Sequence, residues 1–242
     1  KNDIAIYAIH TNLDNVQTGV NKKIADKIGL KNTQILLPKA ATLSKLEVFI
    51  PVVNTDHVLE AMHKAGAGNI GNYSNCTFRV QQTGTFKPND MANPTIGSSN
   101  QQESVEENKV EVIFPSHLEG RIISAMKNAH PYEEVAFYLQ SLKNTNQEVG
   151  SGMIGELETA MNEQDFLSHL KNSMNLNTIK YTPLNVKSIK KVAVCGGAGS
   201  FLLPIAKGAG ADAFVTSDFK YHEFFDAEGK LMIADIGHYE SE

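Results

Sequence analysis

The sequence is short of three things: long apolar runs, cysteines and excess positive charge. No run approaches the roughly 18 consecutive apolar residues of a membrane-spanning helix, so we expect no membrane association. The two cysteines, Cys76 and Cys195, do not form a C-x-x-C pair, and we expect reduced thiols in a cytoplasmic protein. The formal charge of −5 provides no basic field, so we expect no nucleic-acid partner.

The sequence does contain apolar segments with strand and helix patterns. With 242 residues, 41% hydrophobic and 20% charged, the composition is ordinary for a globular protein of one large α/β unit or two modules. The C-terminal part predicts strand, glycine turn, helix, strand and strand over residues 191–195, 196–200, 201–209, 212–216 and 231–234. Strands separated by single helices are expected to be parallel, which brings the polar residues at their carboxyl ends to one edge.

Five polar residues follow these predicted strands, and we expect them to share one crevice. They are Asp218, His222, Asp235, His238 and Glu242. If the chain is helical after Gly237, then His238 and Glu242 lie one turn apart on one face, where an imidazole and a carboxylate can hold the same cation. The alternative is an ordinary surface ion pair at the same spacing.

A second pair with this spacing stands near the other end of the sequence. Residues 4–9 are apolar and predict a buried strand, which would place His10 and Asp14 at its end. Asn12 or Asp14 also fits the N-cap of the helix that follows, so a metal ligand and a helix cap remain alternatives here.

Several phrases resemble the GTP cyclohydrolase I type 2 homologue family, also called NIF-three-like, a group of dinuclear-metal proteins. They occur in order at residues 10–14, 154–157, 194–201, 216–222 and 237–242. The resemblance implies that Asp14, His238 and Glu242 bind metal, with Glu242 shared by two ions and His10 as a further candidate. It implies two divalent ions, with zinc favoured over manganese, iron or magnesium, and a homohexameric assembly.

The same resemblance implies that the sequence is an internal fragment. Members of the family carry two adjacent histidines upstream of the phrase at residues 10–14, and they continue past the glutamate that corresponds to Glu242. We therefore expect part of the metal-binding set to lie outside these 242 residues.

Residues 45–143 have a pattern of their own. They predict the order strand, helix, strand, strand, helix, strand of a ferredoxin-like α+β unit, and they resemble the PII-like or CutA-like insert of some family members. We therefore expect a host α/β domain, with a mostly parallel sheet and flanking helices, at residues 1–44 and 144–242. The insert at 45–143 interrupts it.

The sequence also predicts the local structure of three further segments. Residues 84–108 are polar, and we expect a mobile or partly extended connection between hairpin strands. Asn162 is expected to cap a helix that continues through Leu170 and Met174. The glycine turn at 196–200 either binds phosphate through its amides or allows tight packing of strand on helix.

These features together predict metal-assisted hydrolysis of a nucleotide or phosphoester. Asp218 and Lys220 are candidates for substrate binding, and His222 is a candidate catalytic general acid. The alternative is a non-catalytic, oligomeric metal-binding scaffold whose insert senses a small molecule.

Overall fold

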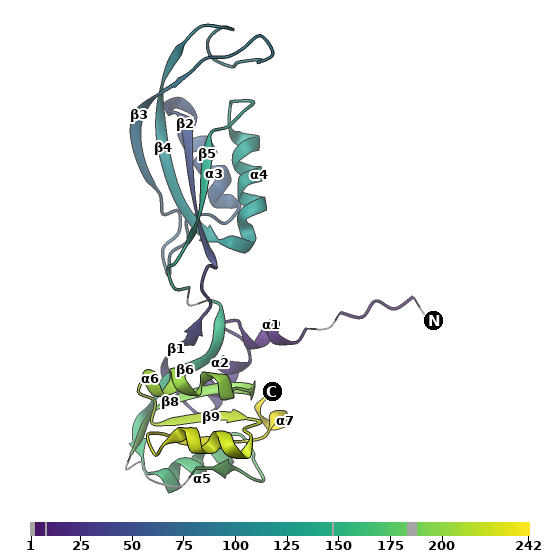
Figure 1. Ribbon diagram of the computed structural model, residues 1–242, viewed down its shortest axis with the longest axis vertical. Coiled ribbons are helices and arrows are strands. Elements are labelled where there is room, and N and C mark those ends of the chain that lie inside the picture. Colours follow the sequence, from purple (N-terminus) through teal and green to yellow (C-terminus); the bar gives the residue numbers. More distant parts are fainter. Residues whose placement is uncertain (1–2, 8, 147, 183–187) are drawn as a thin grey trace. The chain divides into compact units, whose positions relative to one another are not determined.

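The computed structural model of the protein describes residues 3–7, 9–146, 148–182 and 188–242 (Figure 1). The chain divides into two compact units. The first comprises residues 1–39 and 146–242, and the second comprises residues 40–145. None of the helices among the described residues is long and apolar enough to span a membrane.

The first unit contains a six-stranded sheet in the order β1-β6-β8-β9-β10-β7. These strands are β1 (Lys31–Pro38), β6 (Gly150–Met161), β7 (Lys180–Tyr181), β8 (Ile189–Ala198), β9 (Ala213–Ser217) and β10 (Met232–Asp235). Only β8 with β9 and β9 with β10 are parallel, whereas the other three pairings are antiparallel. The expectation of a mostly parallel sheet is therefore wrong, and the sheet is mixed. The chain between β6 and β8 contains a helix and also β7, so it is not a one-helix crossover.

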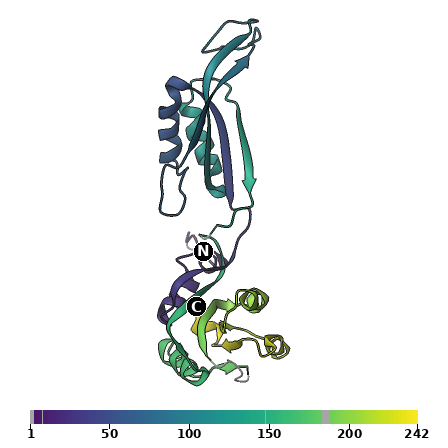
Figure 2. The ribbon, with the colours of Figure 1, turned by 90° about the vertical axis from the view of Figure 1, so that its left-hand side faces the viewer.

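Apolar side chains cover both faces of this sheet. The helices of the unit are α1 (Thr11–Asp14), α2 (Val20–Lys27), α5 (Glu163–Ser173), α6 (Leu203–Gly208) and α7 (His238–Ser241). Val192 and Val194 of β8 belong to the core that includes α2 and α5, while Ala193 and Cys195 belong to the core that includes α6. Alternate residues of a strand point to opposite faces, so β8 is buried on both sides (Figure 2).

The predicted N-terminal strand is absent. Residues 3–7 and 9 form no strand, and Ile4 and Ile6 are 74% and 91% exposed. An apolar run forms a strand only where it pairs with the edge of a sheet. None of the described strands pairs with this run. His10 therefore precedes α1, and Asp14 is the last residue of that helix. The N-cap of α2 is Gly19, so the alternative in which Asn12 or Asp14 caps this helix is also wrong.

The second unit has the predicted βαββαβ order. Its elements are β2 (Leu43–Pro51), α3 (Thr55–Lys64), β3 (Phe78–Phe86), β4 (Glu103–Pro115), α4 (Glu119–Ala129) and β5 (Phe137–Leu142). The four strands form an antiparallel sheet in the order β3-β4-β2-β5. Alternate residues of β2, Leu46, Val48 and Ile50, are fully buried in the core that includes Val58 and Ile122 of the two helices. Both helices lie on one face of the sheet (Figure 2).

The polar stretch at residues 84–108 is a partly extended connection between hairpin strands, which is one of its two expected forms. Its two ends extend the antiparallel pairing of β3 with β4 as far as Phe86 and Glu103. The connection between them is held in place: the Asn93 amide donates to Glu133 Oε1 at 2.9 Å, and the Thr95 hydroxyl donates to the Pro131 carbonyl at 2.8 Å. Backbone pairing and side-chain hydrogen bonds thus order a segment that contains few apolar residues.

Candidate metal centre

A buried carboxylate shapes the loops from which the candidate site is built. Asp235 lies at the end of β10, where one carboxylate oxygen accepts from the Phe219 amide and the other from the Gly237 amide, each at 3.1 Å. Gly237 has a φ of +92°, which favours glycine, and it directs the chain into α7. Asp235 was expected in the crevice, and it serves here to hold the loops that follow β9 and β10.

Helix α7 brings His238 and Glu242 together. His238 Nε2 lies 3.3 Å from Glu242 Oε2, which is the one-turn spacing expected from the sequence. On the other side of the ring, His238 Nδ1 lies 2.5 Å from Asp218 Oδ2. Asp218 follows β9 in the left-handed backbone region, with a φ of +58°. The imidazole therefore lies between two carboxylates. Its pKa is raised chiefly by the hydrogen bond to Asp218, which outweighs the opposing effect of burial, and Glu242 adds a smaller increase.

The glycines at the end of β8 pack against this helix, so the strand continues through residues at which the sequence predicted a turn. A Cβ atom on Gly197 would lie 2.5 Å from Glu242 Oε1 and 3.4 Å from His238 Cε1. The Gly197 amide donates to the Ser241 hydroxyl at 3.0 Å, and the Gly196 amide donates to Asn21 Oδ1 at 2.9 Å. Because both amides are already bonded to side chains, the structure favours the packing interpretation of these glycines over a phosphate cradle.

Asp14 joins the cluster from the N-terminal part of the first unit. Its pKa is raised first by burial and then by the negative charge of Glu242, while His10 and His238 act in the opposite direction. Cys195 is buried beside them, and burial followed by the charges of Asp14 and Glu242 raises its pKa to about 12. The charges of Asp14 and Glu242 thus act on one another, although none of the described hydrogen bonds or ion pairs joins the Asp14 carboxylate to His238 or Glu242.

Asn21 is a part of this arrangement that the sequence interpretation missed. It is buried on α2, where its side chain donates to the Asp14 carbonyl at 2.7 Å and accepts from Gly196. It therefore ties the end of α1 to the glycine turn. The available signal was a polar residue three positions before Ile24, on the apolar face of the predicted helix.

Lys220 and His222 stand apart from the cluster. Both are exposed, and none of the hydrogen bonds among the described residues links either side chain to His238 or Glu242. The Lys220 amide donates to Glu223 Oε2 at 2.8 Å, which caps the 3₁₀ turn Tyr221–Ala227. Of the residues proposed for substrate and catalysis, only Asp218 contacts a predicted ligand.

The histidine and carboxylate side chains of the candidate site are of the types that bind divalent cations. In histidines that bind metal through one ring nitrogen, the other ring nitrogen is commonly hydrogen-bonded to a carboxylate. Asp218 is bonded to Nδ1 of His238 in this way. The other ring nitrogen, Nε2, faces Glu242. The negative charges of Asp14 and Glu242 repel one another, and a bound cation would reduce this repulsion. Within the described residues, however, no three His, Cys, Asp or Glu side chains are close enough to form a complete metal-binding group.

Comparisons with known proteins cover the chain from end to end. The profile of the Duf34/NIF3 (NGG1p interacting factor 3) family matches residues 1–242. Proteins named GTP cyclohydrolase 1 type 2 homolog from Halalkalibacterium halodurans and Bacillus subtilis are 44% and 40% identical over 241 residues. The alignments cover 98% and 99% of this chain but 64% and 65% of those proteins.

A solved structure shows the same fold over nearly the whole chain. The crystal structure of a Bacillus cereus protein related to NIF3 superposes with a TM-score of 0.86 at 42% sequence identity. It covers 99% of this chain and 64% of the solved one. A Staphylococcus aureus crystal structure gives a TM-score of 0.69 at 28% identity over 99% of this chain. The chain thus spans a little under two thirds of the length of these relatives.

Proposed function

The chain belongs to the Duf34/NIF3 family, and on that premise we propose that it binds divalent metal and hydrolyses a nucleotide or another phosphoester. The observation that carries this proposal is the placement of His238. One of its ring nitrogens is held by Asp218, and the other faces Glu242. The chemistry of this set, an oriented imidazole with two nearby carboxylates, is that of a site for zinc, or alternatively manganese, iron or magnesium.

Asp14, His238 and Glu242 would hold the metal, with His10 as a further candidate. A pair of divalent ions would supply polarisation of a substrate oxygen and a bound water of lowered pKa. Asp218 orients the ring of His238, and Gly197 leaves the space that the Glu242 carboxylate occupies. Asn21 fixes the end of α1, and with it Asp14, against the glycine turn.

Lys220 and His222 are proposed to act on the substrate rather than on the metal. They follow Asp218 on the segment after β9, where their exposed side chains are free to meet a bound molecule. Lys220 would neutralise a phosphate, and His222 would donate a proton to the leaving group.

Elemental analysis of the purified protein tests the proposed ligands. Glu242→Ala should lose the bound metal, because it removes the carboxylate that faces His238 and whose charge acts on Asp14. Glu240→Ala is the matched control, since it removes a carboxylate from the same short helix while leaving both contacts of His238. Circular dichroism should show both variants folded. Full metal content in Glu242→Ala would overturn the assignment.

A hydrolysis screen tests the reaction. Nucleotides and phosphodiesters would be offered to the protein loaded in turn with zinc, manganese, iron and magnesium. Turnover that depends on added metal and falls by at least about 100-fold in His222→Ala supports the assigned proton donor. Turnover of the same size in that variant would contradict the role of His222.

A second candidate function is a non-catalytic metal-binding scaffold that assembles as a homohexamer. A large exposed aromatic side chain on α7 favours it, because Tyr239 lies between His238 and Glu242 in the sequence and is 91% exposed. A neighbouring copy of the chain would cover such a residue. Metal binding and a hexameric mass by analytical ultracentrifugation, without hydrolysis of any substrate in the screen, would select this function.

A further inference from the structure

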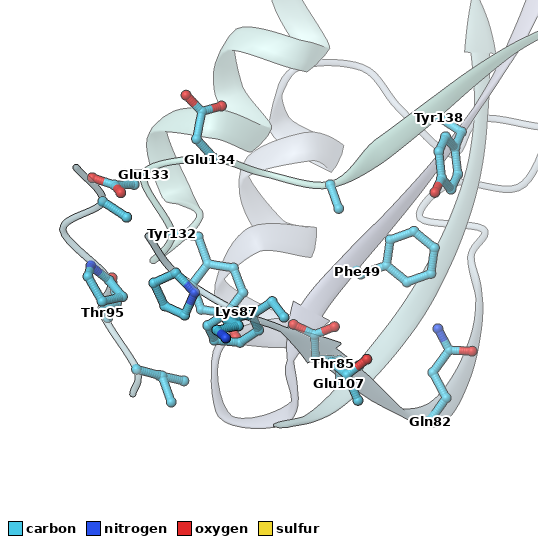
Figure 3. Close-up of a pocket in the computed structure, with 17 residues that line it drawn as sticks. Phe49, Gln82, Thr85, Lys87, Thr95, Glu107, Tyr132, Glu133, Glu134 and Tyr138 are labelled. Atoms are coloured by element: carbon cyan, nitrogen blue, oxygen red, sulfur yellow. The ribbon is translucent and has the colours of Figure 1, made fainter. Parts of the chain in front are cut away.

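The second unit contains a cavity of about 460 Å³ on the face of its sheet that the helices leave uncovered. Leu46, Val48 and Ile50 of β2 point into the core, so Phe49 points to the opposite face. There its ring meets Tyr138 of β5 edge to face, with 5.7 Å between the ring centroids. Gln82 of β3 and Glu107 of β4 are paired across the sheet and complete the floor (Figure 3).

The walls of the cavity are fixed to this floor. The buried His130 ring accepts from the Tyr132 amide at Nδ1 at 3.1 Å, so its Nε2 donates to the Phe49 carbonyl at 2.9 Å. This places Tyr132 at the rim, where its ring also packs against Phe86. The hydrogen bonds of Asn93 and Thr95 to residues 133 and 131 close the other side. The cavity is therefore formed before any molecule enters it.

Two polar groups at this cavity, the Glu107 carboxylate and the Tyr132 hydroxyl, interact with each other and with no cation among the described residues. Glu107 is only 8% exposed, yet none of the described lysine, arginine or histidine side chains pairs with its carboxylate. The Tyr132 hydroxyl is buried and makes no hydrogen bond of ordinary geometry to any described residue. Burial, and then the nearby Glu107, raises the pKa of Tyr132 to about 12. Buried polar groups are normally satisfied, and a ligand with an N–H donor would complete the hydrogen bonding of this pair.

The sheet makes room for the carboxylate in a specific way. Gly84 lies on β3 beside Glu107, and a Cβ atom there would stand 2.4 Å from Glu107 Oε2. In Figure 3 the carboxylate lies between Tyr132 on one side and Phe49 on the other. Glu133 and Glu134 lie at the outer edge of the lining, where both are exposed and their carboxylates point away from Glu107, and Lys87 is the single lysine of the lining (Figure 3).

We propose that this cavity binds a small organic cation, namely a flat ring that carries an N–H donor group, with the donor on Glu107 and the ring against Phe49 and Tyr138. The buried Glu107 carboxylate favours a cation over an anion, and Glu133 and Glu134 make the edge of the cavity negative as well. The aromatic side chains offer flat apolar surfaces to a ring and negative ring faces to a positive charge. The site is independent of the candidate metal centre, since every residue that lines it belongs to the second unit.

Benzamidine, a flat aromatic cation with N–H donors, is the probe that tests this site. Binding to the full chain would be followed by NMR titration, with benzoate as the ligand of the same shape and opposite charge. Benzamidine should shift the resonances of Phe49, Tyr132 and Tyr138, and benzoate should bind at least about tenfold more weakly. Equal binding of the two, or no binding of benzamidine at millimolar concentration, would overturn the proposal. A second copy of the chain that fills the cavity, detected by analytical ultracentrifugation and loss of the shifts, would overturn it as well.

Two substitutions separate a binding role of Glu107 from a structural one. Glu107→Gln keeps the shape and removes the charge, so benzamidine should bind at least about tenfold more weakly while the midpoint of thermal unfolding is unchanged or higher. A lower midpoint together with unchanged binding would show that Glu107 is structural.

Gly84→Ala should also weaken binding, because its methyl group displaces the carboxylate. Gly120→Ala on α4, where an added Cβ meets no atom within 4 Å, is its matched control and should bind as the wild type does.

Discussion

The two units present their carboxylates in opposite ways. At the candidate metal centre, Asp218 and the His238 ring that it holds are each 48% exposed, and solvent screens both groups. In the cavity of the second unit, Glu107 is buried against aromatic side chains and has no cationic partner among the described residues. An exposed, already paired cluster gains substantially only from an ion of high charge density. A carboxylate that is largely buried and has no cation beside it needs less added charge, so a single N–H donor is enough to stabilise it.

The largest expected effect concerns the separate cores of the two units, which should unfold independently of each other. Phe214 is fully buried in the first unit and Phe114 in the second. Replacing either by alanine should destabilise its own unit by about 3 to 5 kcal/mol, because the change leaves a cavity in a packed core. Native-state hydrogen exchange should show the loss of protection confined to that unit. Loss of protection in both units from either substitution would mean that the two cores unfold together.

A smaller effect is expected at a helix terminus of the first unit. The Asn162 side chain accepts from the Asp165 amide at 2.8 Å and so caps α5, as the sequence predicted. Asn162→Ala should cost about 1 kcal/mol in the first unit and leave hydrogen exchange in the second unchanged. Asn172→Ala in the last turn of α5 is the matched control, because its exposed side chain has no capping bond. An equal cost for both would show that the cap contributes nothing.

Local patterns predicted most elements correctly. The strand at 212–216, the cap at Asn162 and the βαββαβ order depend on periodicity, turn residues and capping, all of which are written in neighbouring residues. The spacing of His238 and Glu242 was predicted for the same reason, since one helical turn suffices to bring them together. Their role as metal ligands stays a prediction.

Features that depend on distant partners were not predictable in this way. The run at residues 4–9 is apolar, but residues 4–7 and 9 pair with none of the described strands. The direction of β6 relative to β8 depends on the path of the chain between them. The cavity in the second unit needs Gly84, Glu107 and Tyr132 from three separate segments. No spacing in the sequence connects these residues, although an isolated Gly within a strand pattern signals close approach by another group.

The smallest expected effect is a difference in pKa between one histidine of each unit, His238 in the first and His130 in the second. Hydrogen bonding to Asp218 raises the pKa of His238, whereas burial lowers the pKa of His130 and its bond to the Phe49 carbonyl only partly opposes this. The contribution of His238 to stability is thus full below the pKa of the unfolded state, about 6.5, and is lost as pH rises through the folded value. The contribution of His130 has the opposite sign, because it is full above about 6.5 and declines as pH falls toward its lower folded value.

An NMR titration of the imidazole resonances, with chelator present to keep the protein free of metal, measures both shifts at once. His238 should titrate above the ordinary histidine value and His130 below it. Asp218→Asn should lower the pKa of His238 because the amide cannot hold the charged ring as the carboxylate does, while His130 stays unchanged. Glu240→Gln removes the same charge from a site that does not contact the ring, so it should leave His238 near its wild-type value. A matching drop in both variants would mean that general charge, rather than the Asp218 hydrogen bond, sets the protonation of His238, and the oriented imidazole would lose its main support.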